Sequence, residues 1–147
     1  MKGNPAQINL IAAWLGILLG FLSGMVLGMF FHREGWLGGY ASLKRRMYRL
    51  GHIALFALGA VNLMFWLTMR NLPVSNPLAG WASSLFLLGA VTMPLCCVIM
   101  AHRPKLHLIF SVPVVSLIAA AVLTLAMILN AGDMSSASPQ LSPLNPP

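Results

Sequence analysis

Acidic side chains are almost absent from this chain of 147 residues, and charged residues of either sign are few. Asp and Glu together number 2, Lys and Arg number 9, and charged residues make up 7% of the chain, whereas soluble domains carry about a quarter. The two cysteines, Cys96 and Cys97, are adjacent, so they cannot join distant elements in a disulfide framework. The composition excludes a disulfide scaffold, and no polar segment is long enough to bury a soluble core.

The scarcity of carboxylates also narrows the chemistry that the chain could perform. Glu34 and Asp133 are the two acids, and both lie outside the apolar stretches. Transport coupled to protons or cations normally uses an intramembrane acid or a compensated charge. A hydrolase would need an intramembrane Asp pair, a zinc-binding HExxH or a Ser–His arrangement, and the sequence has none of these. We therefore expect a protein that is not an enzyme.

Long apolar stretches are what the chain has in abundance, since 59% of its residues are hydrophobic. A helix needs about 20 apolar residues to cross a hydrocarbon core of about 30 Å. Four stretches meet this length, at about 8–31, 50–69, 78–100 and 106–129. We predict an all-α integral membrane protein, an up-and-down bundle of four transmembrane helices over 1–129, followed by a flexible Pro- and Ser-rich tail over 130–147.

Basic residues are unevenly distributed between the two sides of the predicted bundle. Lys2 and Arg70 lie on one side, and the first and third connectors carry the others: Arg33, Lys44, Arg45, Arg46, Arg49, Arg103 and Lys105. The positive-inside rule then places both termini outside and these connectors in the cytoplasm. We expect a multi-pass protein of a bacterial inner membrane. Anionic lipid headgroups, rather than nucleic acid, are the natural partners of these cations.

The first connector carries a helical pattern of its own. Leu43, Met47 and Leu50 recur at helical spacing, which predicts a short interfacial helix that leads into the second span. A cluster of basic residues surrounds them: Lys44, Arg45, Arg46 and Arg49. The cluster either anchors and orients the chain or forms a site for anionic lipid or for a docking partner.

Four glycines in the first span follow a strict spacing of four: Gly16, Gly20, Gly24 and Gly28. This spacing lines them up on one helix face, where another helix can approach closely, and such packing is a main source of helix association in lipid. The stripe is expected to pack against another span of this chain, to dock against another subunit, or to join two copies. Asn62, near the middle of the second span, is expected to hydrogen-bond across helices.

The histidines all fall on the predicted cytoplasmic side. His52 opens the second span and His107 opens the fourth, so in a simple bundle the two imidazoles would face each other across the core. Neutral imidazole is a common axial ligand of haem iron. One b-type haem held by His52 and His107 is therefore one hypothesis, and two interfacial polar residues without a ligand are the other.

A copper site is a weaker hypothesis for the end of the third span. The soft or borderline ligands there are Cys96, Cys97, Met100 and His102. Their spacing matches no established metal site, and Cys and Met are ordinary fillers of apolar interiors. We assign no metal ligands.

The function that these patterns favour is a small non-catalytic accessory or assembly subunit of a larger membrane complex, associated through the glycine stripe of the first span. In general architecture the chain is similar to small haem-associated respiratory membrane proteins, which implies a respiratory or redox complex as the setting. Two alternatives remain: a membrane protein that binds a single b-type haem or metal in electron transport, and, with least support, a small transporter or channel.

Overall fold

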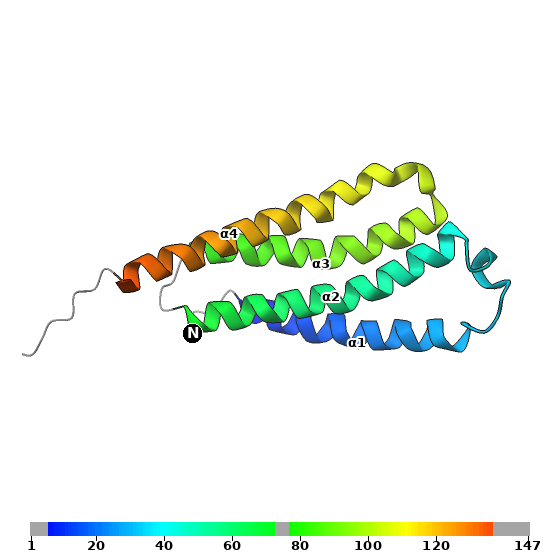
Figure 1. Ribbon diagram of the computed structural model, residues 1–147, viewed down its shortest axis with the longest axis horizontal. Helices are drawn as coiled ribbons and strands as arrows, with labels where there is room; N and C mark the ends of the chain where they lie inside the picture. The colour runs from blue at the N-terminus through cyan, green and yellow to red at the C-terminus, as the bar shows by residue number, and fades with distance from the viewer. Residues whose placement is uncertain (1–5, 73–76, 137–147) are drawn as a thin grey trace, which may run out of the picture.

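The computed structural model describes residues 6–72 and 77–136, and within these ranges it contains helices and turns but no strands. Four long helices lie side by side along the long axis of the molecule (Figure 1). They are α1 (Gln7–Met29), α2 (Leu43–Asn71), α3 (Leu78–His102) and α4 (Ser111–Ser136). Four helical segments are long and apolar enough to cross a membrane. The chain is thus a multi-pass membrane protein, and the predicted all-α architecture with four spans is confirmed.

The helices pack in chain order, with α1 against α2, α2 against α3 and α3 against α4. Successive helices run in opposite directions (Figure 1). A cluster of buried hydrophobic residues joins the last three helices at the end of the molecule far from the first connector. It includes Phe65, Phe86 and Met127, and the ring centroids of the two phenylalanines lie 5.1 Å apart. Such an aromatic contact adds to the packing energy of the pair.

The second helix starts earlier than hydropathy alone suggests. Ser42 has an extended backbone, and its Oγ accepts a hydrogen bond from the Arg45 backbone N–H at 3.2 Å. A serine in this position satisfies one of the amides that the first helical turn leaves unpaired. The helix predicted to lead into the second span is therefore the first part of one continuous α2. All the basic residues from Lys44 to Arg49 lie on its first two turns.

The fourth span differs from the expected single helix beginning at Leu106. It opens with a 3-10 helix, η2 (Pro104–Phe110), and α4 follows from Ser111. Pro113 lies in the first turn of α4, where its missing N–H costs no helical hydrogen bond. At its other end α4 continues to Ser136, so the beginning of the predicted tail is helical. Residues 137–147 of that tail lie outside the described residues.

The loop of residues 30–42 folds back onto the start of α2. It contains a short 3-10 turn, η1 (Trp36–Gly38). Leu37 has a φ of 54°, a left-handed conformation that is uncommon for residues other than glycine. The Ser42 hydroxyl donates a hydrogen bond to the Leu37 carbonyl at 2.6 Å. This turn sets the positions of Trp36 and Tyr40 beside α2.

Candidate functional site

A buried polar cluster ties the first three helices together. Asn9 of α1 donates a hydrogen bond to the side-chain oxygen of Asn62 of α2 at 2.8 Å, and the Ser83 hydroxyl of α3 donates to the side-chain oxygen of Asn9. Asn62 also donates to the Leu58 carbonyl at 2.8 Å. In the part of the chain that the structure describes, no buried side-chain nitrogen or oxygen lacks a partner. Asn9, Asn62 and Ser83 therefore connect the first three helices to one another.

The first two helices approach most closely at a pair of glycines. A Cβ built on Gly16 would lie 3.0 Å from the Leu55 carbonyl oxygen and 3.3 Å from the Cα of Gly59. A Cβ built on Gly59 would lie 3.0 Å from the Ala13 carbonyl oxygen. Each glycine thus admits the backbone of the other helix, which is the packing that small residues permit in lipid.

Gly20 and Gly24 of the stripe meet side chains of α2 rather than its backbone. A Cβ on Gly20 would lie 2.8 Å from the Phe56 ring, and one on Gly24 would lie 2.7 Å from the His52 ring. Gly28 has nothing within 4 Å of its Cβ position. Gly16, Gly20 and Gly24 are therefore packed against α2 of the same chain, and Gly16 remains partly exposed at the edge of that contact.

The two histidines of the haem hypothesis lie in different surroundings. His52 faces α1, where its Nδ1 lies 3.0 Å from the Ser23 hydroxyl oxygen and its ring covers Gly24. His107 is exposed on η2, which packs against α3 and α4. Because α1 and η2 lie at opposite ends of the packing order, the structure does not bring the two imidazoles to a shared site. This pair does not fit a haem that both would ligate.

The candidate copper ligands also have separate partners. The Cys96 thiol is buried and donates to the Ile109 carbonyl at 3.4 Å, and Cys97 is buried as well. The His102 Nε2 lies 3.0 Å from the Tyr48 hydroxyl, which links the start of α2 to the end of α3. No group of three or more His, Cys, Asp or Glu side chains among the described residues could hold a metal ion.

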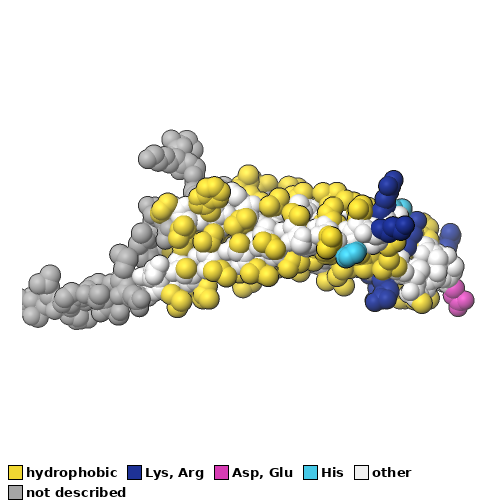
Figure 2. Space-filling view, turned by 90° about the horizontal axis from the view of Figure 1, so that it is seen from above, with side chains coloured by type: hydrophobic (Ala, Val, Ile, Leu, Met, Phe, Trp, Pro, Cys, Tyr) yellow, Lys and Arg dark blue, Asp and Glu magenta, His cyan; other side chains and the backbone are white. Residues whose placement is uncertain are grey.

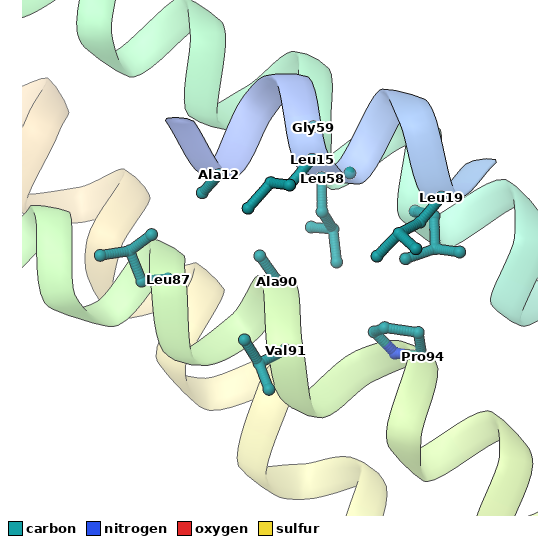
Figure 3. A pocket seen from close by; sticks show the side chains of 11 residues that line it. Ala12, Leu15, Leu19, Leu58, Gly59, Leu87, Ala90, Val91 and Pro94 are labelled. Carbon is teal, nitrogen blue, oxygen red and sulfur yellow. The ribbon is translucent and has the colours of Figure 1, made fainter. Parts of the chain in front are cut away.

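An apolar groove lies between α1 and α3, and α2 forms its floor (Figure 3). Its volume is about 290 Å³. Leucines, Val91 and Pro94 line part of it, and the rest of its wall is formed by small residues: Ala12, Gly16, Gly59 and Ala90. A surface of small residues within a membrane allows another helix to come close.

Basic side chains gather at one end of the molecule (Figure 2). We call this the basic end; it comprises the loop of residues 30–42, the first two turns of α2, the last turn of α3 and η2. With Arg103, which joins α3 to η2, this end carries all seven cations of the first and third connectors. This end is the one that the positive-inside rule assigns to the cytoplasm.

Arg45 is the organising residue of the basic end and is only 1% exposed. Its Nη2 donates to the Phe31 carbonyl at 2.8 Å, and its Nη1 lies 3.4 Å from the Arg33 carbonyl. The guanidinium carbon lies 3.8 Å from the centroid of the Tyr40 ring and 5.7 Å from that of Trp36. These carbonyl and cation–π contacts hold the loop of residues 30–42 on α2.

A cavity opens beside this arginine, and we call it the basic cavity. Arg45, Arg49 and His52 line it from α2, where their spacing places them on one helix face. The other walls come from the end of α1, from the loop and from α2: Leu27, Gly28, Phe31, Trp36 and Ile53. Its volume is about 280 Å³. Lys44 and Arg46 of the predicted cluster lie outside the cavity. The four basic residues therefore lie on different faces of α2, and only Arg45 and Arg49 line the cavity.

Comparisons with protein-family models, with curated proteins and with solved structures find no match to this chain. The site is therefore defined by its own geometry. Its parts are a paired polar interior, an apolar groove among small residues and a basic cavity at one end of the spans.

Proposed function

We propose that this protein is a non-catalytic accessory or assembly subunit of a larger membrane complex, and that a transmembrane helix of a partner packs into the groove between α1 and α3. The observation that carries the proposal is that all three helices lining the groove contribute small residues to it: Ala12, Gly16, Gly59 and Ala90. Lipid tails are as apolar as leucine, so helices associate in a membrane through close packing rather than through burial of apolar surface. At its alanines and glycines the groove lets the backbone of a partner helix come close.

The paired interior supports a binding role over chemistry or transport. Asn62 has its amide committed to Asn9 and to the Leu58 carbonyl, so it offers no free group along a path through the spans. The sequence places no carboxylate in a span, and ion pathways usually contain one. A respiratory or redox complex remains our hypothesis for the setting of this subunit.

The test is to fill the groove without adding charge. Ala12→Leu and Ala90→Leu, combined in one chain, place two larger side chains in the groove. Ala60→Leu is the matched control, because Ala60 is exposed on α2 and does not line the groove. We expect the native protein, solubilised gently from its own membrane, to copurify with a stoichiometric partner. The double variant should retain about tenfold less partner, the effect of about 1.4 kcal/mol of lost packing, and the control should retain it all.

Two results would overturn the proposal. One is a native protein that purifies without any stoichiometric partner, and the other is equal retention of the partner by the double variant and by Ala60→Leu. An optical spectrum of the same preparation, oxidised and then reduced with dithionite, addresses the haem alternative. A Soret band that is lost in His52→Ala would replace our proposal with a haem-binding function.

A further inference from the structure

The cations of the basic end exceed what the chain itself can neutralise. The sequence has 9 Lys and Arg against 2 Asp and Glu, so the side-chain carboxylates leave most of the positive charge without a counter-charge. Arg45 shows the consequence most clearly, since its buried guanidinium is held by carbonyl oxygens and aromatic rings. A buried charge is costly unless other groups compensate it. An anion in the cavity that Arg45 lines would add that compensation.

The polar wall of the basic cavity has the donors that a phosphate needs. Arg49 and His52 line it together with Arg45. A guanidinium presents its N–H groups as a fork that matches phosphate oxygens, and an imidazole N–H can add a further donor. Ser23 lies 3.0 Å from Nδ1 of His52 and orients the ring. Three nitrogen-bearing side chains therefore line one space.

The lining of the same cavity also includes apolar residues. Leu27 and Ile53 line it, and Ile53 is 57% exposed on the outer surface of α2. Gly28 leaves open space at its Cβ position. Trp36, a residue type that favours the headgroup level of a membrane, also lines the cavity. A ligand with a charged head and an apolar body matches this gradient better than a free inorganic anion does.

We propose that the basic cavity binds the phosphate of an anionic phospholipid, with Arg49 and His52 contacting the phosphate and the acyl chains leaving the cavity over Gly28 and Ile53. Arg45 is a positioning residue that holds the loop of residues 30–42 and keeps the cavity positive. This inference does not depend on the partner helix proposed for the groove between α1 and α3.

The experiment measures thermal unfolding of the full-length protein in dodecyl maltoside while dioleoyl phosphatidylglycerol is titrated. A ligand that binds only the folded state raises the melting temperature with a saturable dependence on its concentration. We expect such a rise with phosphatidylglycerol and none with dioleoyl phosphatidylcholine. Inorganic phosphate and glycerol 1-phosphate, titrated in parallel, should give no rise.

Two matched charge variants locate the effect. Arg49→Gln removes a cation from the cavity, and Arg46→Gln removes one from the same two turns of α2 outside the cavity. We expect Arg49→Gln to raise the half-saturating phosphatidylglycerol concentration about tenfold, as the loss of one charge-assisted hydrogen bond implies. Arg46→Gln should stay close to the native value.

Gly28→Leu tests the site without changing any charge. Its Cβ meets nothing within 4 Å, so the chain should fold, and the new side chain fills the apolar side of the cavity. We expect it to weaken the phosphatidylglycerol effect as strongly as Arg49→Gln does. Gly80→Leu is its control, because Gly80 also has open space but lies at the start of α3.

Three results would overturn the inference. Equal shifts for Arg46→Gln and Arg49→Gln would show that surface charge alone attracts the lipid. An unchanged phosphatidylglycerol response in Gly28→Leu would place the lipid elsewhere. A rise with inorganic phosphate as large as that with phosphatidylglycerol would make the cavity a site for a free anion.

Discussion

Replacing Arg45 by methionine tests how the loop of residues 30–42 is held on α2. The 2.8 Å bond from Arg45 to the Phe31 carbonyl is worth about 1.5–3 kcal/mol, as is usual for a charged donor. The Tyr40 ring, 3.8 Å away, adds about 1 kcal/mol. The 3.4 Å approach to the Arg33 carbonyl is too long to add much. Methionine removes the cost of burying a cation, which offsets part of the loss, so we expect a net loss of about 2 kcal/mol.

The assay is limited proteolysis by trypsin at the bond after Arg33, which lies within the loop. A loss of about 2 kcal/mol increases the open population about 30-fold, and cleavage follows that population when opening is fast. We expect Arg45→Met to be cut about 30 times faster at this bond than the native protein. Arg45→Lys should be intermediate, because lysine keeps the charge without the planar fork. Arg46→Met, which alters an exposed residue, is the control, and equal cleavage rates for it and Arg45→Met would refute the reasoning.

Further predictions concern the interior and the glycine stripe. Asn62→Ala removes the acceptor that lies 2.8 Å from the Asn9 amide and should lower the free energy of unfolding by about 1 kcal/mol; an unchanged value would mean that the bond contributes nothing. Gly20→Leu meets the Phe56 ring, 2.8 Å from the Cβ position, and should sharply lower the yield of folded protein in detergent. Gly28→Ala, with open space at that position, should instead raise the stability by about 0.5–1 kcal/mol through helix propensity, and equal outcomes at the two glycines would contradict the observed packing.

The four spans could be predicted because length and hydropathy act over about 20 residues and tolerate local exceptions. The start of α2 at Leu43 was less accessible, since the four cations before Leu50 lower the hydropathy of its first turns. The start of this helix is indicated by its N-terminal capping residue instead. Ser42 supplies the cap, and the helical recurrence of Leu43 and Leu50 continues without interruption into the span.

The basic cavity could be predicted only in part. Arg45 and Arg49 were identified as members of a cation cluster, but adjacency in sequence joined them to residues on other faces of the helix. Spacings of four and three place Arg45, Arg49 and His52 on one helix face, and this pattern can be read from the sequence. The positions of Trp36 and Tyr40 cannot be predicted in this way. They depend on the left-handed backbone of Leu37, which no turn pattern in the sequence indicates.

The haem pair shows where equal depth in a membrane is not enough to infer contact. His52 and His107 open helices that start from the same side, but the side-chain direction depends on helix rotation. Ser23 and Gly24 of α1 provide a hydrogen bond and a space for the His52 ring, which keeps it on the α1 side. The partner of Asn62 was missed for a related reason. Asn9 lies near the end of a span, where polar residues are common. Its pairing with Asn62 can be predicted only when the depths of the first three spans in the membrane are compared.

The glycine stripe connects the packing of the spans to the cavity at the basic end. Seen as a sequence, Gly16, Gly20, Gly24 and Gly28 are equivalent, but the distance between α1 and α2 grows along them (Figure 1). The first meets the backbone of α2, and the last meets nothing within 4 Å. The second meets the Phe56 ring and the third meets the His52 ring. Beyond the His52 ring no described side chain fills the space between the two helices at Gly28, and the basic cavity begins there. Had α1 and α2 remained in backbone contact to their ends, Gly28 would be a packing residue and the space beside it would be closed. One pattern of small residues therefore provides both the adhesion of two helices and, where that adhesion stops, the space in which we place the lipid.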